Sequence, residues 1–248
     1  MFDDRVWENF RIEHDARGVV TAWLDVPGRP VNVFDESVMQ ELFWLIERLE
    51  HASGIQAVIF RSAKESGFLA GADVSRIQTI ASREEAETTS GLGQQIFDRL
   101  EKLPMPTVAV IHGPCLGGGL EFVLACRYRI ACDDSRTRLG LPEIELGLLP
   151  GWGGTQRLPR LIGLASALRM ILEAKKLSAR EAAKWGLADL AVVPEKLNGE
   201  VDRFVSNLLA GHAPARKRPS PSVSRSAASS RMPALWNFSS TVASGSPV

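Results

Sequence analysis

The sequence is poor in residues that build metal centres and nucleophilic triads. It has four histidines and three cysteines among 248 residues. Cys115, Cys126 and Cys132 are spaced by 11 and 6 residues, which is not a metal-ligand pattern. His112 stands alone at the end of an apolar run, so we interpret it as structural. We expect no metal site. Three thiols in apolar surroundings indicate a reducing compartment, so we expect cytoplasmic localisation.

Long apolar runs and an excess of charge are also missing. No stretch is long and apolar enough to span a bilayer, and no apolar run of a secretory signal follows residues 1–5. The 29 basic residues balance the 29 acidic residues, so nucleic acid is not an expected partner. With 45% hydrophobic residues, the chain can bury a sizeable core.

The last part of the sequence has a different composition. Residues 211–248 contain ten serines, five prolines and five basic residues but no acidic residue. A segment of this composition cannot form a packed core by itself. We therefore expect one globular domain over residues 1–210, followed by a disordered or truncated tail over residues 211–248.

The pattern of apolar residues predicts strands that alternate with helices. The expected strands are residues 11–15, 19–26, 55–60, 107–112 and 127–132, of which the first two form a hairpin. The expected helices are residues 36–49, 83–103, 120–126, 155–161, 165–173, 179–185 and 197–209. This order predicts a layered α/β fold with a C-terminal helical region.

Three consecutive glycines at 117–119 lie between a predicted strand and a predicted helix. The first amides of a helix have no internal partner and carry partial positive charge, so they can bind an oxyanion. Glu121 follows Gly118 by three residues, and its side chain should lean back toward the Gly118 amide. We expect the helix dipole to favour the ionised form of Glu121. The alternatives are a simple tight turn and a glutamate that only stabilises the first helical turn.

A second acidic candidate follows Pro142, whose fixed φ restricts the direction of Glu143. We expect an extended segment here, in which Glu145 would share the same face, and the pattern does not choose between the two. Two carboxylates in different environments can take different protonation states near neutral pH. A pair formed by Glu121 and one of these residues could therefore act as base and acid.

A further turn of small residues covers 67–73. The small side chains of Ala70, Gly71 and Ala72 would expose backbone N–H groups to a ligand. The alternative is a surface loop that Asp73 caps.

Four segments together resemble the crotonase (enoyl-CoA hydratase/isomerase) superfamily. They are FLAGAD at 68–73, HGPCLGGGLE at 112–121, LPE at 141–143 and LGLLPGWGGTQRLPR at 146–160. The resemblance extends from about Phe10 to about Phe204. Residues 126–131 and the gap of 22 residues between Glu121 and Glu143 are most similar to the hydratase portion of the multifunctional fatty-acid oxidation α-subunit.

The resemblance implies a superhelix of ββα units that assembles as a homotrimer or a dimer of trimers. It also implies an acyl-CoA thioester substrate and a place in a β-oxidation complex. Coenzyme A is then part of the substrate, and no separate cofactor is expected. The implied reaction adds water across the 2,3-double bond of a trans-2-enoyl-CoA.

By motif position, the resemblance also assigns roles to individual residues. Glu121 deprotonates the water, and protonated Glu143 supplies a proton to Cα. The residues assigned to the thioester oxygen and the CoA loop are the amides of Ala70 and Gly118, with Gly71, Ala72 and Asp73. The alternatives are a Δ3,Δ2-enoyl-CoA isomerase, which needs one carboxylate, and a non-catalytic acyl-CoA-binding subunit.

Overall fold

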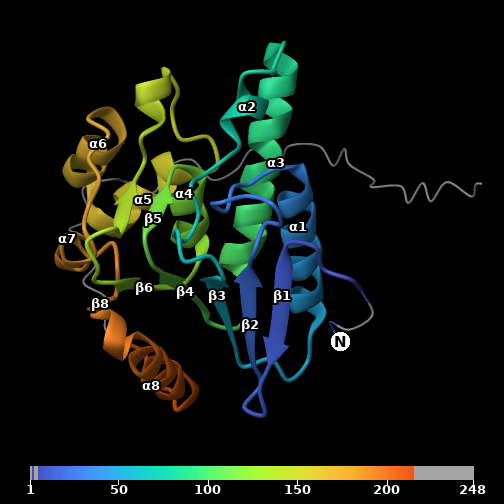
Figure 1. Ribbon diagram of the computed structural model, residues 1–248, viewed down its shortest axis with the longest axis vertical. Helices are drawn as coiled ribbons and strands as arrows, with labels where there is room; N and C mark the ends of the chain where they lie inside the picture. Colours follow the sequence, from blue (N-terminus) through green and yellow to red (C-terminus); the bar gives the residue numbers. More distant parts are fainter. Residues whose placement is uncertain (1, 3–4, 215–248) are drawn as a thin grey trace, which may run out of the picture.

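A mixed β-sheet forms the centre of the structure, a computed structural model that describes residue 2 and residues 5–214. Within these residues the strand order of the sheet is β1-β2-β3-β4-β6-β8 (Figure 1). Its strands are β1 (Phe10–His14), β2 (Val19–Leu24), β3 (Ala57–Ser62), β4 (Thr107–Ile111), β6 (Tyr128–Cys132) and β8 (Leu190–Val192). β1 is antiparallel to β2, and the remaining pairs are parallel. Of the segment 211–248, for which we expected disorder or truncation, residues 215–248 lie outside the described residues.

Two short strands bring distant parts of the sequence together. β5 (Pro114–Leu116) pairs in parallel with β7 (Arg138–Gly140). The Leu116 N–H donates to Leu69 O over 3.1 Å, and the Gly117 N–H donates to Gly140 O over 2.9 Å. The small-residue turn, the glycine run and the segment that leads to Glu143 therefore meet at β5.

Eight α-helices accompany these strands in the described residues, and side-chain caps explain several of their starts. Asp35 accepts a hydrogen bond from Val38 N over 3.0 Å, and Ser178 forms a capping box with Glu181. The α-helices are α1 (Glu36–His51), α2 (Val74–Ile77), α3 (Arg83–Lys102), α4 (Gly118–Ala125), α5 (Gly154–Ile162), α6 (Leu164–Leu172), α7 (Ala179–Trp185) and α8 (Leu197–Leu209). Short 3₁₀ helices are η1 (Glu143–Leu146) and η2 (Pro194–Lys196).

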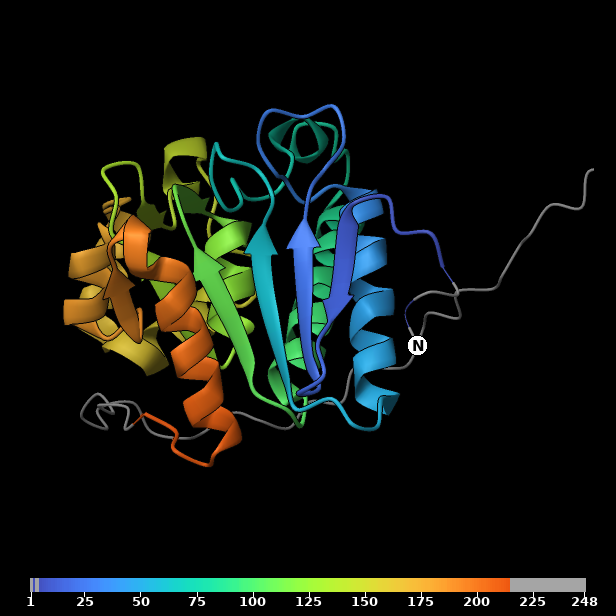
Figure 2. The same cartoon turned by 60° about the horizontal axis from the view of Figure 1, so that its bottom comes forward.

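The sheet is covered on both faces. Alternate strand residues point to opposite faces, and they divide between two apolar clusters. One cluster joins Val108 and Ile130 to Phe204 of α8, whereas the other joins Phe60 and Ile111 to the helices α1, α3 and α4. Figure 2 shows α8 crossing one face of the sheet, with α1 and α3 on the other side.

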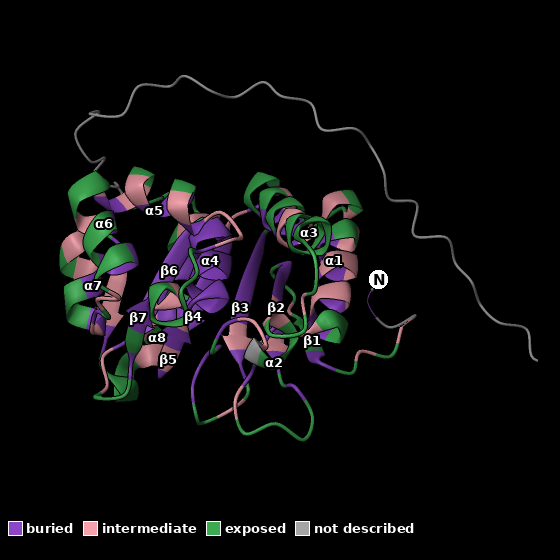
Figure 3. Ribbon diagram, turned by 90° about the horizontal axis from the view of Figure 1, so that it is seen from above, coloured by how far each residue is buried: buried purple, intermediate pink, exposed green. Residues whose placement is uncertain are grey.

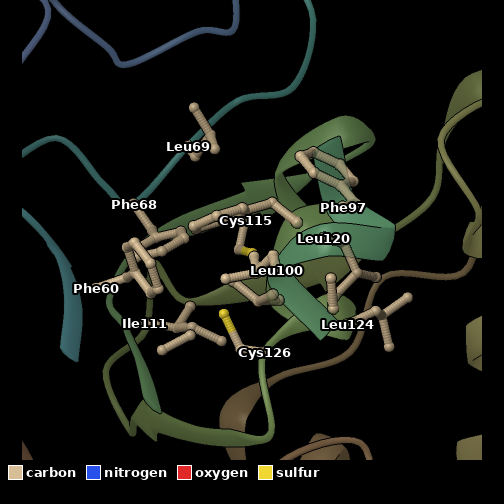
Figure 4. Close-up of a cluster of buried hydrophobic side chains, with 14 of the residues drawn as sticks. Phe60, Phe68, Leu69, Phe97, Leu100, Ile111, Cys115, Leu120, Leu124 and Cys126 are labelled. Atoms are coloured by element: carbon tan, nitrogen blue, oxygen red, sulfur yellow. The ribbon is translucent and has the colours of Figure 1, made fainter. Parts of the chain in front are cut away.

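Helix α4 lies at the centre of the second cluster, and all of its residues are buried (Figure 3). Leu120 and Leu124 pack beside Leu100 of α3 and Ile111 of β4 (Figure 4). Glu121, which belongs to this helix, is therefore buried in the protein interior.

The helices predicted from apolar spacing agree with the observed helices to within a few residues, and the layered α/β arrangement with its C-terminal helices is confirmed. The expectation of an extended segment at Glu143 is wrong, because this residue begins η1. The short elements β5, β7, β8 and α2 were not predicted. Each has only three or four residues, which is too short for a period to be recognised.

Gly119→Ala is expected to lower the free energy of unfolding by about 1–3 kcal/mol. The physical reason is that a Cβ atom on Gly119 would overlap Leu69 O, where the small-residue turn packs on α4. Gly91→Ala in α3 is the matched control, because a Cβ there meets no atom within 4 Å. It should raise stability by about 0.5–1 kcal/mol. Urea unfolding measures both changes, and equal midpoints for the two variants would contradict the expectation.

Candidate functional site

Glu121 lies in the first turn of α4 and is only 2% exposed. Its Oε1 accepts hydrogen bonds from two main-chain groups, Trp152 N at 2.8 Å and Gly154 N at 2.7 Å. A buried carboxylate that is held by two N–H donors has a fixed orientation. The turn that precedes α5 therefore positions the Glu121 carboxylate.

The pKa of Glu121 is raised above its ordinary value because burial disfavours the charged form. The N–H groups of Gly154 and Trp152 and the charge of Arg157 oppose this rise. The helix start was expected to favour the ionised form of Glu121. Burial has the larger effect, so the pKa of Glu121 is raised overall. The opposing donors nevertheless distinguish Glu121 from the second carboxylate of the site.

Glu143 has no comparable partners. Among the described residues no group makes a hydrogen bond of ordinary geometry to either carboxylate oxygen, although both oxygens are buried. Burial raises the pKa of Glu143 to about 7. The backbone N–H of Glu143 itself opposes this rise, and the charge of Glu121 adds to it. The two carboxylates are thus close enough to interact.

A Cβ atom built on Gly117 would lie 3.4 Å from Glu143 Oε1, which places this carboxyl group beside the glycine turn.

Glu145, the alternative to Glu143, points elsewhere. Its carboxylate lies 3.3 Å from Lys176 Nζ, and 55% of its side chain is exposed. The segment is a 3₁₀ helix, so residues two positions apart do not share a face as they would in a strand. The structure therefore brings Glu143, and not Glu145, together with Glu121.

Two main-chain amides face the same region. Gly118 N begins α4, and Ala72 N lies in the small-residue turn; within the described part of the chain neither donates to a protein acceptor. A Cβ built on Gly118 would lie 3.5 Å from Ala72 N, and a Cβ built on Gly71 would lie 3.4 Å from Gly118 N. Gly71 has φ +100°, a conformation that favours glycine, and it allows the two segments to approach so closely.

The assignment of the Ala70 amide to an oxyanion site is wrong. The Ala70 N–H donates to Asn32 O over 2.9 Å, so this donor is already used in joining two loops. In the small-residue turn, Ala72, two residues later, has the amide that remains available beside Gly118. The sequence could not distinguish the two alanines, because both are small and both are adjacent to Gly71.

The Asp73 side chain stabilises the turn from within. Asp73 Oδ1 accepts a hydrogen bond from Ser75 Oγ over 2.6 Å, and Oδ2 lies 2.8 Å from Arg29 Nη2. The hydrogen bonds from Ser75, followed by the contact with Arg29, hold the pKa of Asp73 below its ordinary value despite some desolvation. These contacts correspond to the capping role that was the alternative interpretation of Asp73.

The sequence analysis missed the turn before α5 as part of the site. Its amides at Trp152 and Gly154 hold Glu121, and the Trp152 ring packs edge-on against Phe34 and Phe97. The signal was present, because glycines at 151, 153 and 154 precede α5 much as the glycine run precedes α4.

The remaining polar candidates do not join this site. His112 Nε2 lies 2.7 Å from Lys64 O, a contact that anchors the backbone. The three cysteines are free and buried, and burial raises the pKa of Cys126 to about 12. In the described ranges, no cluster of three or more His, Cys, Asp or Glu side chains is arranged to hold a metal ion. None of the helices described is long and apolar enough to cross a membrane.

The arrangement combines three chemical functions. A buried carboxylate with hydrogen-bond donors, a buried carboxyl group without them and a pair of amides come together around the glycine turn. The first can accept a proton, the second can donate one near neutral pH, and the amides can stabilise an oxygen that gains negative charge.

Comparisons with known proteins identify relatives of this chain. The family model described as Enoyl-CoA hydratase/isomerase matches residues 16–232. A fatty acid oxidation complex subunit alpha from Vibrio campbellii is 46% identical over 186 residues, covering 75% of this chain and 26% of that protein. The subunit of the same name from Shewanella loihica is 42% identical over 210 residues, covering 85% of this chain and 29% of that protein. The chain therefore spans less than a third of the length of these relatives.

Solved structures have the same fold. An enoyl-CoA hydratase from Bacillus anthracis matches with a TM-score of 0.73 and 31% identity, covering 82% of this chain and 76% of that chain. An enoyl-CoA hydratase from Mycobacterium smegmatis matches with a TM-score of 0.76 and 27% identity, covering 82% of this chain and 77% of that chain. The predicted crotonase-like fold is confirmed.

Proposed function

The chain belongs to the enoyl-CoA hydratase/isomerase family, and we propose that it adds water across the 2,3-double bond of trans-2-enoyl-CoA thioesters in fatty-acid β-oxidation. The observation that carries this proposal is a pair of glutamates, buried Glu121 and half-buried Glu143, whose carboxyl groups have different surroundings. Glu121 has two N–H donors, whereas within the described part of the chain no group makes a hydrogen bond of ordinary geometry to the oxygens of Glu143. An addition of water needs both a base and an acid, and this pair supplies one of each.

The amides of Ala72 and Gly118 bind the thioester oxygen in this mechanism. Negative charge develops on that oxygen when a nucleophile adds to C3 of the conjugated double bond. Two preorganised N–H donors stabilise this charge without reorganising, and the loss of one such donor typically costs about 10²–10³ in rate. The partial positive charge at the start of α4 acts in the same direction.

Glu121 and Glu143 move the two protons. Ionised Glu121 takes a proton from the water whose oxygen bonds to C3, and protonated Glu143 gives its proton to C2. The product is a 3-hydroxyacyl-CoA, and the two carboxyl groups have exchanged protonation states, which they restore by exchange with solvent. The site has no need for a cofactor, because coenzyme A enters as part of the substrate.

An isomerase that moves the double bond from the 3- to the 2-position is the second candidate within this family. It requires one carboxylate to shuttle a single proton. The two buried carboxyl groups favour hydration, because an isomerase leaves the second one without a role.

The purified chain is expected to convert both a short and a long 2-enoyl-CoA to 3-hydroxyacyl-CoA. The loss of the absorbance of the conjugated thioester measures this reaction. A parallel incubation with a 3-enoyl-CoA detects isomerisation through a gain of the same absorbance. Isomerisation without hydration would overturn the proposal. Binding without either reaction would favour a non-catalytic acyl-CoA-binding subunit.

The proposal extends to assembly and location. The relatives from Vibrio and Shewanella are named as subunits of a fatty acid oxidation complex. We propose that this chain also acts within such a complex, in the cytoplasm, as a homotrimer or a dimer of trimers. Sedimentation of the purified chain, alone and with the other components of a fatty acid oxidation complex, tests the assembly.

A further inference from the structure

Arg157 is a buried arginine in α5, with 6% of its side chain exposed. Its Nε lies 2.9 Å from Glu101 Oε2, and its Nη2 lies 2.5 Å from Asp98 Oδ1, so two carboxylates of α3 hold the guanidinium. Its Nη1 donates to Trp152 O over 3.0 Å. The planar guanidinium has donors in fixed directions, so it ties the turn before α5 to α3 with defined geometry.

This turn is the one that holds Glu121. The carbonyl of Trp152 accepts from Arg157, while the N–H groups of Trp152 and Gly154 donate to Glu121 Oε1. Gly153 lies between them with φ +107°, and a Cβ atom there would overlap Arg157 Nη1. The close contact of guanidinium and backbone therefore sets the direction in which the two N–H groups point.

The charge of Arg157 also acts on Glu121. Among the described residues, the charged groups that act on the Glu121 carboxylate are Arg157 from α5 and Glu143 from η1. Arg157 also lines an open pocket of about 310 Å³, together with the charged residues Glu101, Arg127, Arg129 and Arg160. Burial raises the pKa of Glu121, and the positive charge of Arg157 opposes this rise.

We propose that Arg157 is a positioning residue for the hydration proposed above. It holds the turn at 152–154 so that two main-chain N–H groups fix the Glu121 carboxylate. Its positive charge favours the ionised form of Glu121, which activates water. Arg157 acts through Glu121 and its turn, with no contact to the reacting atoms. The catalytic consequence of this inference rests on the proposed function. The contact between Arg157 and the turn that holds Glu121 is independent of that function.

Arg157→Gln is expected to lower kcat on the order of 10²-fold with little change in KM, because a misplaced base loses its reacting geometry. The acid limb of the pH–rate profile should move to higher pH, since a positive charge beside Glu121 is lost. Arg157→Lys keeps the charge but not the fork of donors, so its kcat should fall while its acid limb stays near that of the wild type. Arg160→Gln is the matched control on the same helix: its side chain donates to Gln156 over 3.5 Å and makes no hydrogen bond to the turn at 152–154, so no change is expected.

A measurement without turnover separates this inference from the proposed function. The Glu121 carboxyl can be titrated by ¹³C NMR in protein labelled at the glutamate carboxyls, with Glu121→Gln assigning the signal. Its pKa should be higher in Arg157→Gln than in Arg157→Lys or the wild type. An unchanged titration and acid limb, with only a lower melting temperature, would reduce Arg157 to a structural role. If the wild type fails to hydrate any 2-enoyl-CoA, the function is wrong, and the titration still decides the coupling of Arg157 to Glu121.

Discussion

Glu121→Gln and Glu143→Gln are each expected to lower the rate of 2-enoyl-CoA hydration by about 10²–10⁴-fold, the usual contribution of a general acid or base. Glutamine keeps the shape of the side chain and can still accept the hydrogen bonds from Trp152 N and Gly154 N that position residue 121. It cannot accept a proton from water or donate a carboxyl proton to C2. The change therefore removes the proton transfer and preserves the turn.

Glu145→Gln is the matched control for this experiment. Glu145 shares η1 with Glu143 but is exposed and paired with Lys176, so its loss should leave the hydration rate near that of the wild type. Initial rates at saturating and limiting 2-enoyl-CoA give kcat and kcat/KM for the three variants. Near-native turnover by Glu121→Gln or Glu143→Gln would remove that residue from the chemistry. Equal losses in Glu143→Gln and Glu145→Gln would point to damage of η1 instead.

Glu143→Gln is also expected to make the protein more stable at pH 8 than the wild type, while its activity falls. The folded protein raises the pKa of Glu143 from 4.5 to about 7, so the folded state binds this proton more tightly than the unfolded state does. The wild type therefore loses stability as the pH rises from 4.5 to about 7. Such a difference corresponds to about 3 kcal/mol, which partial solvent exposure reduces to about 2 kcal/mol.

Urea unfolding at pH 5 and pH 8 tests this expectation. Glu143→Gln has no titrating group at position 143. Between pH 5 and pH 8, the unfolding free energy of the wild type should therefore fall by about 2 kcal/mol more than that of this variant. Glu145→Gln should follow the wild type, because Glu145 is exposed. If Glu143→Gln and the wild type change in parallel with pH, then Glu143 does not hold its proton more tightly in the folded state.

Much of the fold could be predicted from local patterns. Helix α1 begins at Glu36, where the predicted helix over 36–49 starts, and Asp35 caps it. The glycine run before Glu121 predicted a strand, a turn and a helix in this order, as observed. Such features depend on periodicity and capping, which neighbouring residues determine.

The details of the candidate site were less predictable. Glu143 was expected in an extended segment and lies in η1. The Ala70 amide was expected at the oxyanion site, but it bonds to Asn32, while the Ala72 amide lies beside Gly118. In both cases a difference of one or two residues changes which group faces the site, and local propensity does not resolve such a difference.

The sequence by itself determined that this is a layered α/β protein with Glu121 as one acidic candidate and Glu143 or Glu145 as the other, since composition, periodicity and motif spacing belong to the chain. Only the tertiary structure decided that Trp152 and Gly154 hold Glu121 and that no group of the described residues makes an ordinary hydrogen bond to Glu143. The physical reason is that burial and hydrogen bonding between residues distant in the chain control both the direction of a carboxylate and its affinity for a proton. These relations arise when the turns before α4 and α5 pack against each other.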